Sequence, residues 1–400
     1  MQDFNPQTFR QQFPFFAQAN APVYLDSAAT SLKPQCLIDA TSEFYRSAGS
    51  VHRSQYDAAQ TAQYEQAREL VRDLLNAESA QAVIWTSGTT QAINTVAHGL
   101  LPHLQAGDEI LISQADHHAQ FVTWSEIAKQ AQAKLIVLPI NDQWLIDEDA
   151  LCDNLNERTK LVAINFVSNV TGTEQPVEKL AKLIRQKSKA LICVDAAQAV
   201  AHRKIDLQQL DVDFLAFSAH KLYGPTGLGV LTGKLASLER LRPLQFGGKM
   251  VQTVQTDEIQ FAPLPYRLEA GTPNIAAVIG FHAVLQWLAQ YDVEQMEAHA
   301  VALAEQTKKL FQNAPLFRLF SAPQPSSVLS FVVDGVATAD LATLLAEQNI
   351  AIRSGQHCAQ PYLARIGERA TLRLSFAPYN NQADVQAFAQ ALQRALELLQ

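Results

Sequence analysis

The segment 217–227, Phe-Ser-Ala-His-Lys-Leu-Tyr-Gly-Pro-Thr-Gly, places one lysine, Lys221, among small and polar residues directly after an apolar run. A lysine that is shielded from water, or that lies beside another cation, has a lowered pKa and can act as a nucleophile or a base near neutral pH. Its characteristic covalent product is a Schiff base with a carbonyl group. The alternative is a surface lysine before a Gly-Pro turn, and this segment alone leaves both interpretations open.

A carboxylate stands at the end of another apolar run, where 190–194 leads into Asp195, with Gln198 three residues later. An enzyme that uses pyridoxal phosphate needs an anion beside the ring nitrogen, which keeps the ring protonated as an electron sink. Aspartate together with a Schiff-base lysine is the pair expected for that cofactor. The alternative for Asp195 is a helix N-cap.

Two further turns follow predicted strands. The run Trp-Thr-Ser-Gly-Thr-Thr at 85–90, which ends in Thr89 and Thr90, has the hydroxyls and backbone amides that bind phosphate at a helix N-terminus, or that simply cap a helix. His117 and His118 are adjacent, so at most one of them can stack on a ligand ring, and a purely structural histidine is the alternative. The glycines at 224, 227 and 229 do not match the dinucleotide-binding fingerprint.

A cysteine and an arginine near the C-terminus also have the chemistry of a reactive site. Cys358 follows His357 in the loop 353–361, and an exposed loop with nearby cations favours the thiolate. Arg373 alternates with leucines, so its guanidinium faces away from them and is suited to a substrate α-carboxylate, with a solvated edge-strand arginine as the alternative. The remaining cysteines lie in apolar settings typical of inert core thiols: Cys36, Cys152 and Cys193. Their spacing does not predict a metal site.

Apolar, β-rich runs alternate with helical patterns through the first two thirds of the chain. Strands are predicted at 82–86, 109–113, 134–139, 161–167, 190–194 and 214–218. Helices are predicted between them at 91–100, 119–133 and 177–187. This alternation predicts an α/β fold with a mostly parallel sheet, whose ligands lie beyond the carboxyl ends of the strands.

The pattern changes at 242–273, which is rich in Pro and Gly and has little periodicity, so we expect a functional or interface loop there. Beyond it, helices are predicted at 275–290, 293–312 and 382–399, and strands at 328–333, 350–353 and 371–376. We therefore predict a large domain over 21–287. A smaller α+β domain is predicted from 1–20 and 288–400 and includes the Cys358 loop.

Composition excludes several classes of protein. The 400 residues are 48% hydrophobic and 18% charged, with a formal net charge of −8, which is typical of a compact protein and not of a nucleic-acid or anionic-membrane binder. The N-terminus has no secretory pattern, and the longest stretch without Asp, Glu, Lys or Arg is too polar to span a membrane. We expect a cytoplasmic protein.

The phosphate turn, histidine, aspartate, lysine and late arginine, in this order, resemble a fold-type I pyridoxal phosphate enzyme, with an aspartate aminotransferase-like fold. Motifs spread over nearly the whole chain resemble the group II cysteine desulfurases: 24–30, 87–94, 168–172, 194–198, 218–227, 269–274 and 353–361. Gln356 and the run 375–380 are most similar to the cysteine sulfinate desulfinase (CsdA-like) branch, whereas the SufS-like branch usually has a second histidine in place of Gln356.

The resemblance implies a role for each residue. Lys221 would hold the cofactor and move protons, Cys358 would accept sulfur, and His117 would stack on the ring and carry a proton. Further cofactor contacts would come from Asp195 at the ring nitrogen, Gln198 at the phenolic oxygen, and a phosphate-binding group of Thr89, Thr90, Ser218, His220, Gly271 and Thr272. Substrate contacts would come from Arg373, Asn169, His52 and Arg353. No metal is implied.

The implied reaction converts L-cysteine to L-alanine and leaves a persulfide on Cys358, with cysteine sulfinate and selenocysteine as further substrates. Gly271 and Thr272 would reach the partner's phosphate in a homodimer. A small sulfur-acceptor protein (SufE/CsdE-like) would dock near Cys358, and iron–sulfur cluster assembly is one destination for the sulfur. Two alternatives are a thiol-independent relative, such as a kynureninase-like hydrolase or an amino-acid epimerase, and a cofactor-free scaffold.

Overall fold

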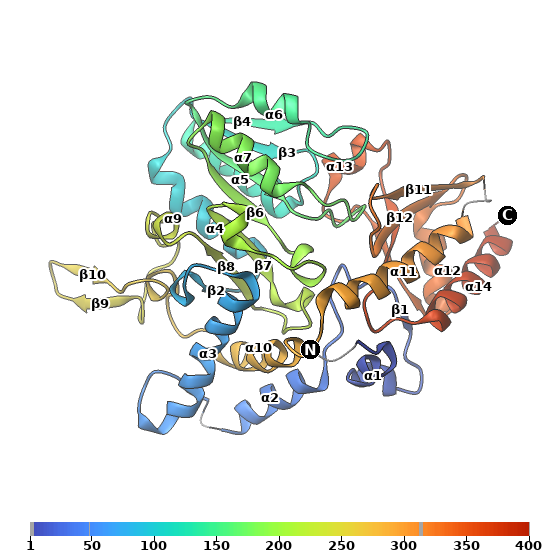
Figure 1. Cartoon of the computed structure of the whole chain (residues 1–400), viewed down its shortest axis with the longest axis horizontal. Helices are drawn as coiled ribbons and strands as arrows, with labels where there is room; N and C mark the ends of the chain where they lie inside the picture. The colour runs from blue at the N-terminus through green and yellow to red at the C-terminus, as the bar shows by residue number, and fades with distance from the viewer. Residues whose placement is uncertain (1–3, 48, 312–314, 400) are drawn as a thin grey trace.

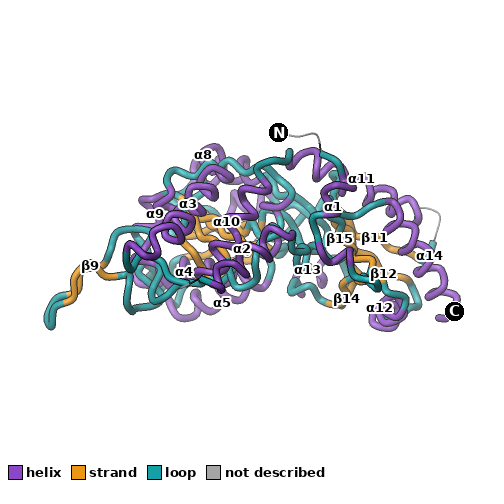
Figure 2. The backbone as a smooth tube through the Cα atoms, turned by 90° about the horizontal axis from the view of Figure 1, so that it is seen from below, coloured by secondary structure: helices purple, strands orange, loops and turns teal. Residues whose placement is uncertain are grey.

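The computed structural model describes residues 4–47, 49–311 and 315–399. Two bodies lie side by side, a larger one around a twisted sheet and a smaller one around a second sheet (Figure 1). Turned by 90°, the strands of each body lie inside a cover of helices (Figure 2). The last residue of the helix predicted at 293–312 and the ends of the predicted small domain lie outside the described residues.

The larger body is built on a seven-stranded sheet. In spatial order its strands are β2 (Ile84–Thr86), β8 (Gly229–Gly233), β7 (Phe214–Ser218), β6 (Leu191–Asp195), β5 (Thr159–Asn165), β3 (Glu109–Ser113) and β4 (Lys134–Leu138). β8 runs antiparallel to both of its neighbours, and the other pairs are parallel. The predicted α/β class with a mostly parallel sheet is confirmed.

Helices cover both faces of this sheet because its strands are apolar on both sides. One face packs against α3 (Ala58–Leu75), α7 (Val177–Lys187) and α10 (Ile275–Leu288). The other packs against α4 (Thr89–Leu100) and α5 (His118–Ala131). Side chains alternate between these faces along each strand. Within β6, Val194 faces the first group of helices, and Cys193 faces the second.

Shorter or more peripheral helices complete this body. They are α2 (Gln35–Arg46), which packs on α10, and α6 (Glu148–Asn154), α8 (Leu207–Leu210) and α9 (Leu235–Glu239). The sequence analysis missed α2 and α3. All six strands predicted before residue 220 are present, within two residues at each end.

The sequence analysis also missed β8, because this strand begins and ends with glycine. Gly229 is required by close packing, since a Cβ atom there would lie 2.4 Å from the Cα of Gly88. Gly88 belongs to the turn between β2 and α4. Gly229, one of the glycines that did not fit a dinucleotide motif, therefore lets β8 approach the predicted phosphate turn.

The expectation of an irregular loop at 242–273 is wrong for its middle part. There, β9 (Val251–Val254) and β10 (Ile259–Phe261) form an antiparallel hairpin that projects away from the body (Figures 1 and 2). Neither strand is buried, so the sequence shows no apolar alternation. Val254 and Ile259 are exposed at the tip of this arm.

The smaller body has a four-stranded antiparallel sheet, in the order β11 (Phe317–Ser321), β12 (Val328–Val333), β15 (Thr371–Ser375) and β14 (Arg353–Gly355). A parallel pair, β1 (Val23–Tyr24) and β13 (Ile350–Ala351), lies beside it. Its helices are α11 (Val293–Phe311), α12 (Thr338–Glu347), α13 (Gln360–Arg365) and α14 (Gln382–Leu399). The short helix α1 (Pro6–Gln11) contacts both bodies, since Phe9 packs in the core of the larger one and Arg10 pairs with Asp384 on α14. The predicted α+β character is confirmed, and the domain boundaries at 20/21 and 287/288 remain predictions.

Candidate active site

A cavity of about 560 Å³ lies where the carboxyl ends of the central strands meet the sheet of the smaller body. It brings together twelve of the residues predicted from sequence: Thr89, Thr90, His117, Asn169, Asp195, Gln198, Ser218, His220, Lys221, Arg353, Cys358 and Arg373. These residues span 284 positions, from Thr89 to Arg373. Only the parallel strand order and the packing of the two bodies place them in one cavity.

Lys221 and Asp195 follow two neighbouring strands. Asp195 ends β6, and Lys221 ends the short 3-10 turn that follows β7. Burial lowers the pKa of Lys221 to about 8, an effect that the charge of Asp195 opposes. Burial likewise raises the pKa of Asp195, against the charge of Lys221. The amine is therefore far easier to deprotonate than an exposed lysine, as a nucleophile and base must be.

The backbone just before Lys221 is held by an unusual number of donors. The carbonyl of His220 accepts hydrogen bonds from the backbone and hydroxyl of Ser31 at 3.0 and 2.9 Å, from Thr30 Oγ1 at 3.2 Å, and from Lys33 Nζ at 2.9 Å. Burial lowers the pKa of Lys33 to about 7. The sequence analysis assigned no role to these residues, although the motif 24–30 ends beside them. Their contacts fix the direction in which the chain enters Lys221.

A turn rich in hydroxyls, at residues 86–89, lies between β2 and the start of α4. Thr89 donates its backbone N–H to Ser218 Oγ at 2.8 Å, and the two hydroxyls lie 2.7 Å apart. Gly88 has φ of 156°, in which a side chain would be strained. Thr90, the second residue of α4, is exposed. A helix N-terminus with this set of donors is suited to a phosphate group.

The cavity fits pyridoxal phosphate by its donor set and by one unpaired amide. Asn165 is 4% exposed and lines the cavity, and within the described part of the chain neither its Oδ1 nor its Nδ2 has a hydrogen-bond partner. Buried polar groups are almost always paired, so this amide indicates a ligand in the cavity. The sequence analysis missed Asn165, although its position at the end of β5 was a usable signal. The phosphate turn, the carboxylate of Asp195 and the amine of Lys221 could hold the phosphate, ring nitrogen and aldehyde carbon.

His117 is the N-cap residue of α5, and its Nδ1 accepts from the backbone N–H of Ala119 at 3.0 Å. This bond places the proton of the neutral ring on Nε2. Burial lowers the pKa of His117 to about 4, and the charge of Lys221 adds to this effect. The imidazole is therefore neutral near pH 7, a suitable state for stacking on a ring.

Burial also lowers the pKa of His357 to about 3, with a further contribution from Arg373. An unfolded histidine has a pKa of about 6.5, so the unfolded chain binds a proton more readily than the folded chain. Above pH 6.5 the histidine is neutral in both states and does not reduce the free energy of unfolding. As the pH falls from 6.5 toward 3, the unfolded chain gains a proton that the folded chain does not, and the free energy of unfolding decreases. We expect His357 alone to lower the free energy of unfolding of the cofactor-free protein by about 2 kcal/mol between pH 7 and pH 5.

Urea denaturation at both pH values measures this effect. His357→Gln should remove that part of the pH dependence, whereas His103→Gln, at a more exposed ring, should keep it. An equal pH dependence in wild type and His357→Gln would contradict the prediction.

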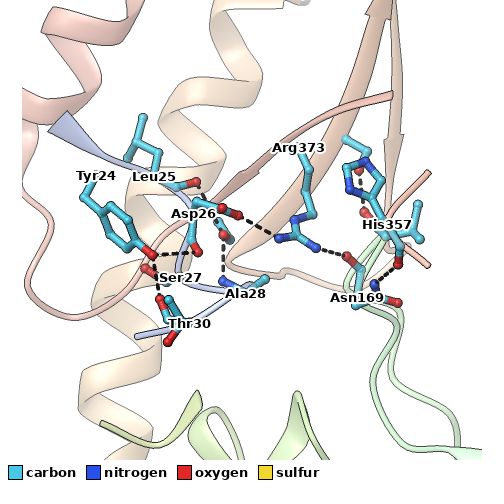
Figure 3. Close-up of polar contacts among 12 residues, drawn as sticks. Tyr24, Leu25, Asp26, Ser27, Ala28, Thr30, Asn169, His357 and Arg373 are labelled. Carbon is cyan, nitrogen blue, oxygen red and sulfur yellow. Dashed lines mark hydrogen bonds and ion pairs between the residues drawn. The ribbon is translucent and has the colours of Figure 1, made fainter. Parts of the chain in front are cut away.

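Arg373 lies on β15 and is 3% exposed. As predicted, its side chain faces the cavity while the flanking leucines pack in the core of the smaller body. Its Nη2 donates to Asp26 Oδ1 at 2.7 Å, and its Nη1 donates to the carbonyl of Asn169 at 3.0 Å (Figure 3). Arg353 pairs with it across β14 and β15 and also lines the cavity. Two guanidinium groups at one cavity are suited to a carboxylate.

Cys358 has the one exposed thiol among the four cysteines, all of which lie in the described part of the chain and are free. Cys193 is buried, and Cys36 and Cys152 are half-buried. Burial raises the pKa of Cys36 to about 11, which keeps its thiol protonated. Among the four cysteines, exposure thus singles out Cys358, and its reactive role remains a prediction.

Three predicted residues do not line this cavity: His52, Gly271 and Thr272. His52 Nε2 lies 3.0 Å from Glu65 Oε1, and the ring packs edge-on against Tyr64 and Tyr266. Gly271 lies at the base of the projecting hairpin, where its N–H bonds to the carbonyl of Gly248. The predicted roles of all three remain predictions, and those of Gly271 and Thr272 require a second subunit.

The base of the hairpin is anchored by a buried ion pair. Arg68 donates to both oxygens of Glu269 at 2.7 Å, and Glu269 Oε1 also accepts from the backbone N–H of Trp85 at 2.6 Å. Trp85 lies on β2, just before the phosphate turn. The segment that leads to Gly271 is therefore tied to the strand that positions Thr89.

None of the described helices is long and apolar enough to cross a membrane.

Comparison with known proteins identifies close relatives over the full length. The family described as Aminotransferase class-V matches residues 23–388. A "Probable cysteine desulfurase" from Haemophilus influenzae is 67% identical over 98% of this chain and 90% of its own length. "Cysteine desulfurase CsdA" from Escherichia coli is 50% identical over the whole of both chains. A crystal structure of that enzyme, described as its S-sulfonic acid form, has a TM-score of 0.94 and 49% identity, covering 99% of this chain and 100% of the other.

Proposed function

The chain belongs to the class-V aminotransferase family, among the CsdA-like group II cysteine desulfurases, and on this premise we propose that it converts L-cysteine to L-alanine and transfers the sulfur to Cys358. The observation that carries the proposal is the cavity itself. It presents a buried lysine of lowered pKa, a buried carboxylate and an exposed thiol to one space. The fold and the family support pyridoxal phosphate as the cofactor.

Bound pyridoxal phosphate would supply a carbonyl for the substrate amine and an electron sink for the carbon that loses a proton. Asp195 would hold the ring nitrogen, Gln198 the phenolic oxygen, and Thr89, Thr90, Ser218 and His220 the phosphate. Gln198 Nε2 already donates to the carbonyl of Ala28 at 2.8 Å, which fixes the orientation of its amide. Together these residues would orient the cofactor in the cavity.

The substrate would be held by its carboxylate at Arg373, with Arg353 and Asn169 beside it. The free amine of Lys221 takes the α-proton. The Cys358 thiolate then attacks the substrate sulfur: an S–S bond forms and the C–S bond breaks. Cβ and Cα each receive a proton, from His117 or Lys221. The products are L-alanine and a persulfide on Cys358, so no external oxidant or reductant is consumed in this half-reaction.

The proposal also includes a sulfur acceptor, a second subunit, further substrates and a cellular location. The exposed thiol is accessible to a small sulfur-acceptor protein of the SufE/CsdE kind, from which sulfur would pass to a pathway such as iron–sulfur cluster assembly. The projecting hairpin with exposed Val254 and Ile259 is suited to contact with a second subunit in a homodimer. Cysteine sulfinate and selenocysteine would be further substrates, and the cytoplasm would be the location.

The test is product analysis from L-cysteine in the presence of a reductant. We expect alanine and sulfide in equal amounts from the cofactor-bound protein, because each turnover releases one of each. If cofactor were bound but no alanine formed, the proposal would be wrong. The thiol-independent hydrolases or epimerases of the same fold would then be the better interpretation.

A further inference from the structure

The loop that carries the thiol is held in a backbone conformation that its residues seldom adopt. His357 has φ of 51° and Cys358 has φ of 53°, so two consecutive residues with side chains lie in the left-handed region. Such residues persist only where the surrounding structure holds them. The contacts that hold this loop therefore determine where the thiol lies.

Two of these contacts come from the larger body. Asn169 Nδ2 donates to the carbonyl of His357 at 2.7 Å (Figure 3), and the backbone N–H of His118 donates to the carbonyl of Cys358 at 2.8 Å. A third contact comes from β15, where Thr371 Oγ1 lies 2.9 Å from His357 Nε2. The side chain of His118 also reaches the loop, because its Nε2 accepts from the backbone N–H of Gln360 at 3.3 Å. Among these contacts, the Asn169 amide is the side-chain donor to a carbonyl of the left-handed pair, and it can be changed without moving a strand.

Asn169 makes a second contact through its backbone. Its backbone carbonyl accepts from Arg373 Nη1 at 3.0 Å, and Arg373 is in turn paired with Asp26. One residue thus touches both the guanidinium that would hold the substrate carboxylate and the loop that carries the nucleophile. Figure 3 shows these groups in a continuous line from Asp26 to His357.

We propose that Asn169 is a positioning residue for the Cys358 thiol. By holding the loop, Asn169 sets the distance between this thiol and the carboxylate of the bound amino acid. The inference rests on the proposed function and deepens it. Because Nδ2 is already bonded to the His357 carbonyl, this role is separate from a direct contact with substrate. Losing that donor frees the left-handed pair to relax, and the thiol then spends less time in line with the substrate sulfur.

The test compares Asn169→Asp with wild type as holoenzymes. Aspartate keeps the shape of the side chain but replaces the Nδ2 donor with an oxygen that cannot donate to the His357 carbonyl when ionised. We expect kcat for L-cysteine to fall by about tenfold or more, with KM changed by less than about threefold. Amide hydrogen exchange over residues 356–360 should become at least about tenfold faster.

A matched control is Asn154→Asp. Asn154 Nδ2 also donates to a backbone carbonyl, that of Ala150 within α6, but it lies outside the cavity. Its variant should leave both kcat and exchange over 356–360 at wild-type values. Asn169→Ala, which removes the donor without adding a charge, should reproduce the effects of Asn169→Asp.

Three results would overturn the inference: an unchanged kcat, a loss expressed only in KM, or unaltered exchange over 356–360 in both Asn169 variants. A loss only in KM would assign Asn169 to substrate binding alone. Failure of the proposed function is distinguishable, because wild type would then form no alanine from cysteine, while the exchange comparison would still report on the loop.

Discussion

Replacing Lys221 with alanine is expected to abolish turnover of L-cysteine, by about 10³-fold or more, and to remove covalent attachment of the cofactor. The physical reason is that one buried amine would serve twice, as the attachment point and as the base that takes the α-proton. Asp195 lies on the adjacent strand and cannot replace it, because a carboxylate forms no Schiff base. The measurements are alanine production and the mass of the protein after borohydride reduction, with and without added pyridoxal phosphate.

Lys234→Ala provides the control for this experiment. Lys234 is half exposed and pairs with Asp211 at the surface, so its loss should alter neither attachment nor turnover. Cofactor fixed by reduction in the Lys221→Ala protein would show that another amine holds it, and our assignment of Lys221 would fail.

The second large effect is expected from Cys358→Ala. Desulfuration of L-cysteine should fall by about 10³-fold or more, because the substrate sulfur then has no acceptor, while the visible spectrum of the bound cofactor is retained. The thiol is exposed, so the substitution should change the free energy of unfolding by no more than about 0.5 kcal/mol. Some activity on selenocysteine or cysteine sulfinate should remain, since these leaving groups depart more readily.

Cys152→Ala is the matched control, since Cys152 is half-buried and does not line the cavity. It should retain full activity. Normal release of sulfide from L-cysteine by the Cys358→Ala protein would show that sulfur leaves without a protein persulfide, and the transfer step proposed above would be wrong.

Local sequence was sufficient for the residues whose chemistry is carried by side-chain type and position after a strand. Lys221 and Asp195 each follow an apolar run, and strands of that kind end at the same edge of a parallel sheet. Cys358 was separable from the other cysteines because its neighbours are polar and theirs are apolar. For the same reason the six strands predicted before residue 220 agree with the observed ones within two residues, whereas the single strand predicted at 350–353 is wrong, because β13 and β14 divide it between two sheets.

Some elements left no periodic signal to read. β8 contains glycine at both ends, and the strands of the hairpin at 251–261 are exposed on both faces. The need for glycine at position 229 is explained only by its contact with Gly88, which comes from another part of the chain. Alternation along a sequence indicates an element with one buried face. β8 is buried throughout and has glycine at both ends, and the hairpin strands have no buried face, so neither shows alternation.

What the sequence by itself determined is therefore the set of reactive groups and the α/β framework that gathers them. Only the tertiary structure decided how those groups are restrained: the pairing of Arg373 with Asp26, 347 residues away, the donors gathered on the His220 carbonyl, and the hold of Asn169 on the Cys358 loop. Each of these contacts joins segments from distant parts of the chain, and several are made to backbone carbonyls, which every residue type carries. A contact whose acceptor is common to all residues has no local signature, so it becomes visible only when the packing of the two bodies brings donor and acceptor together.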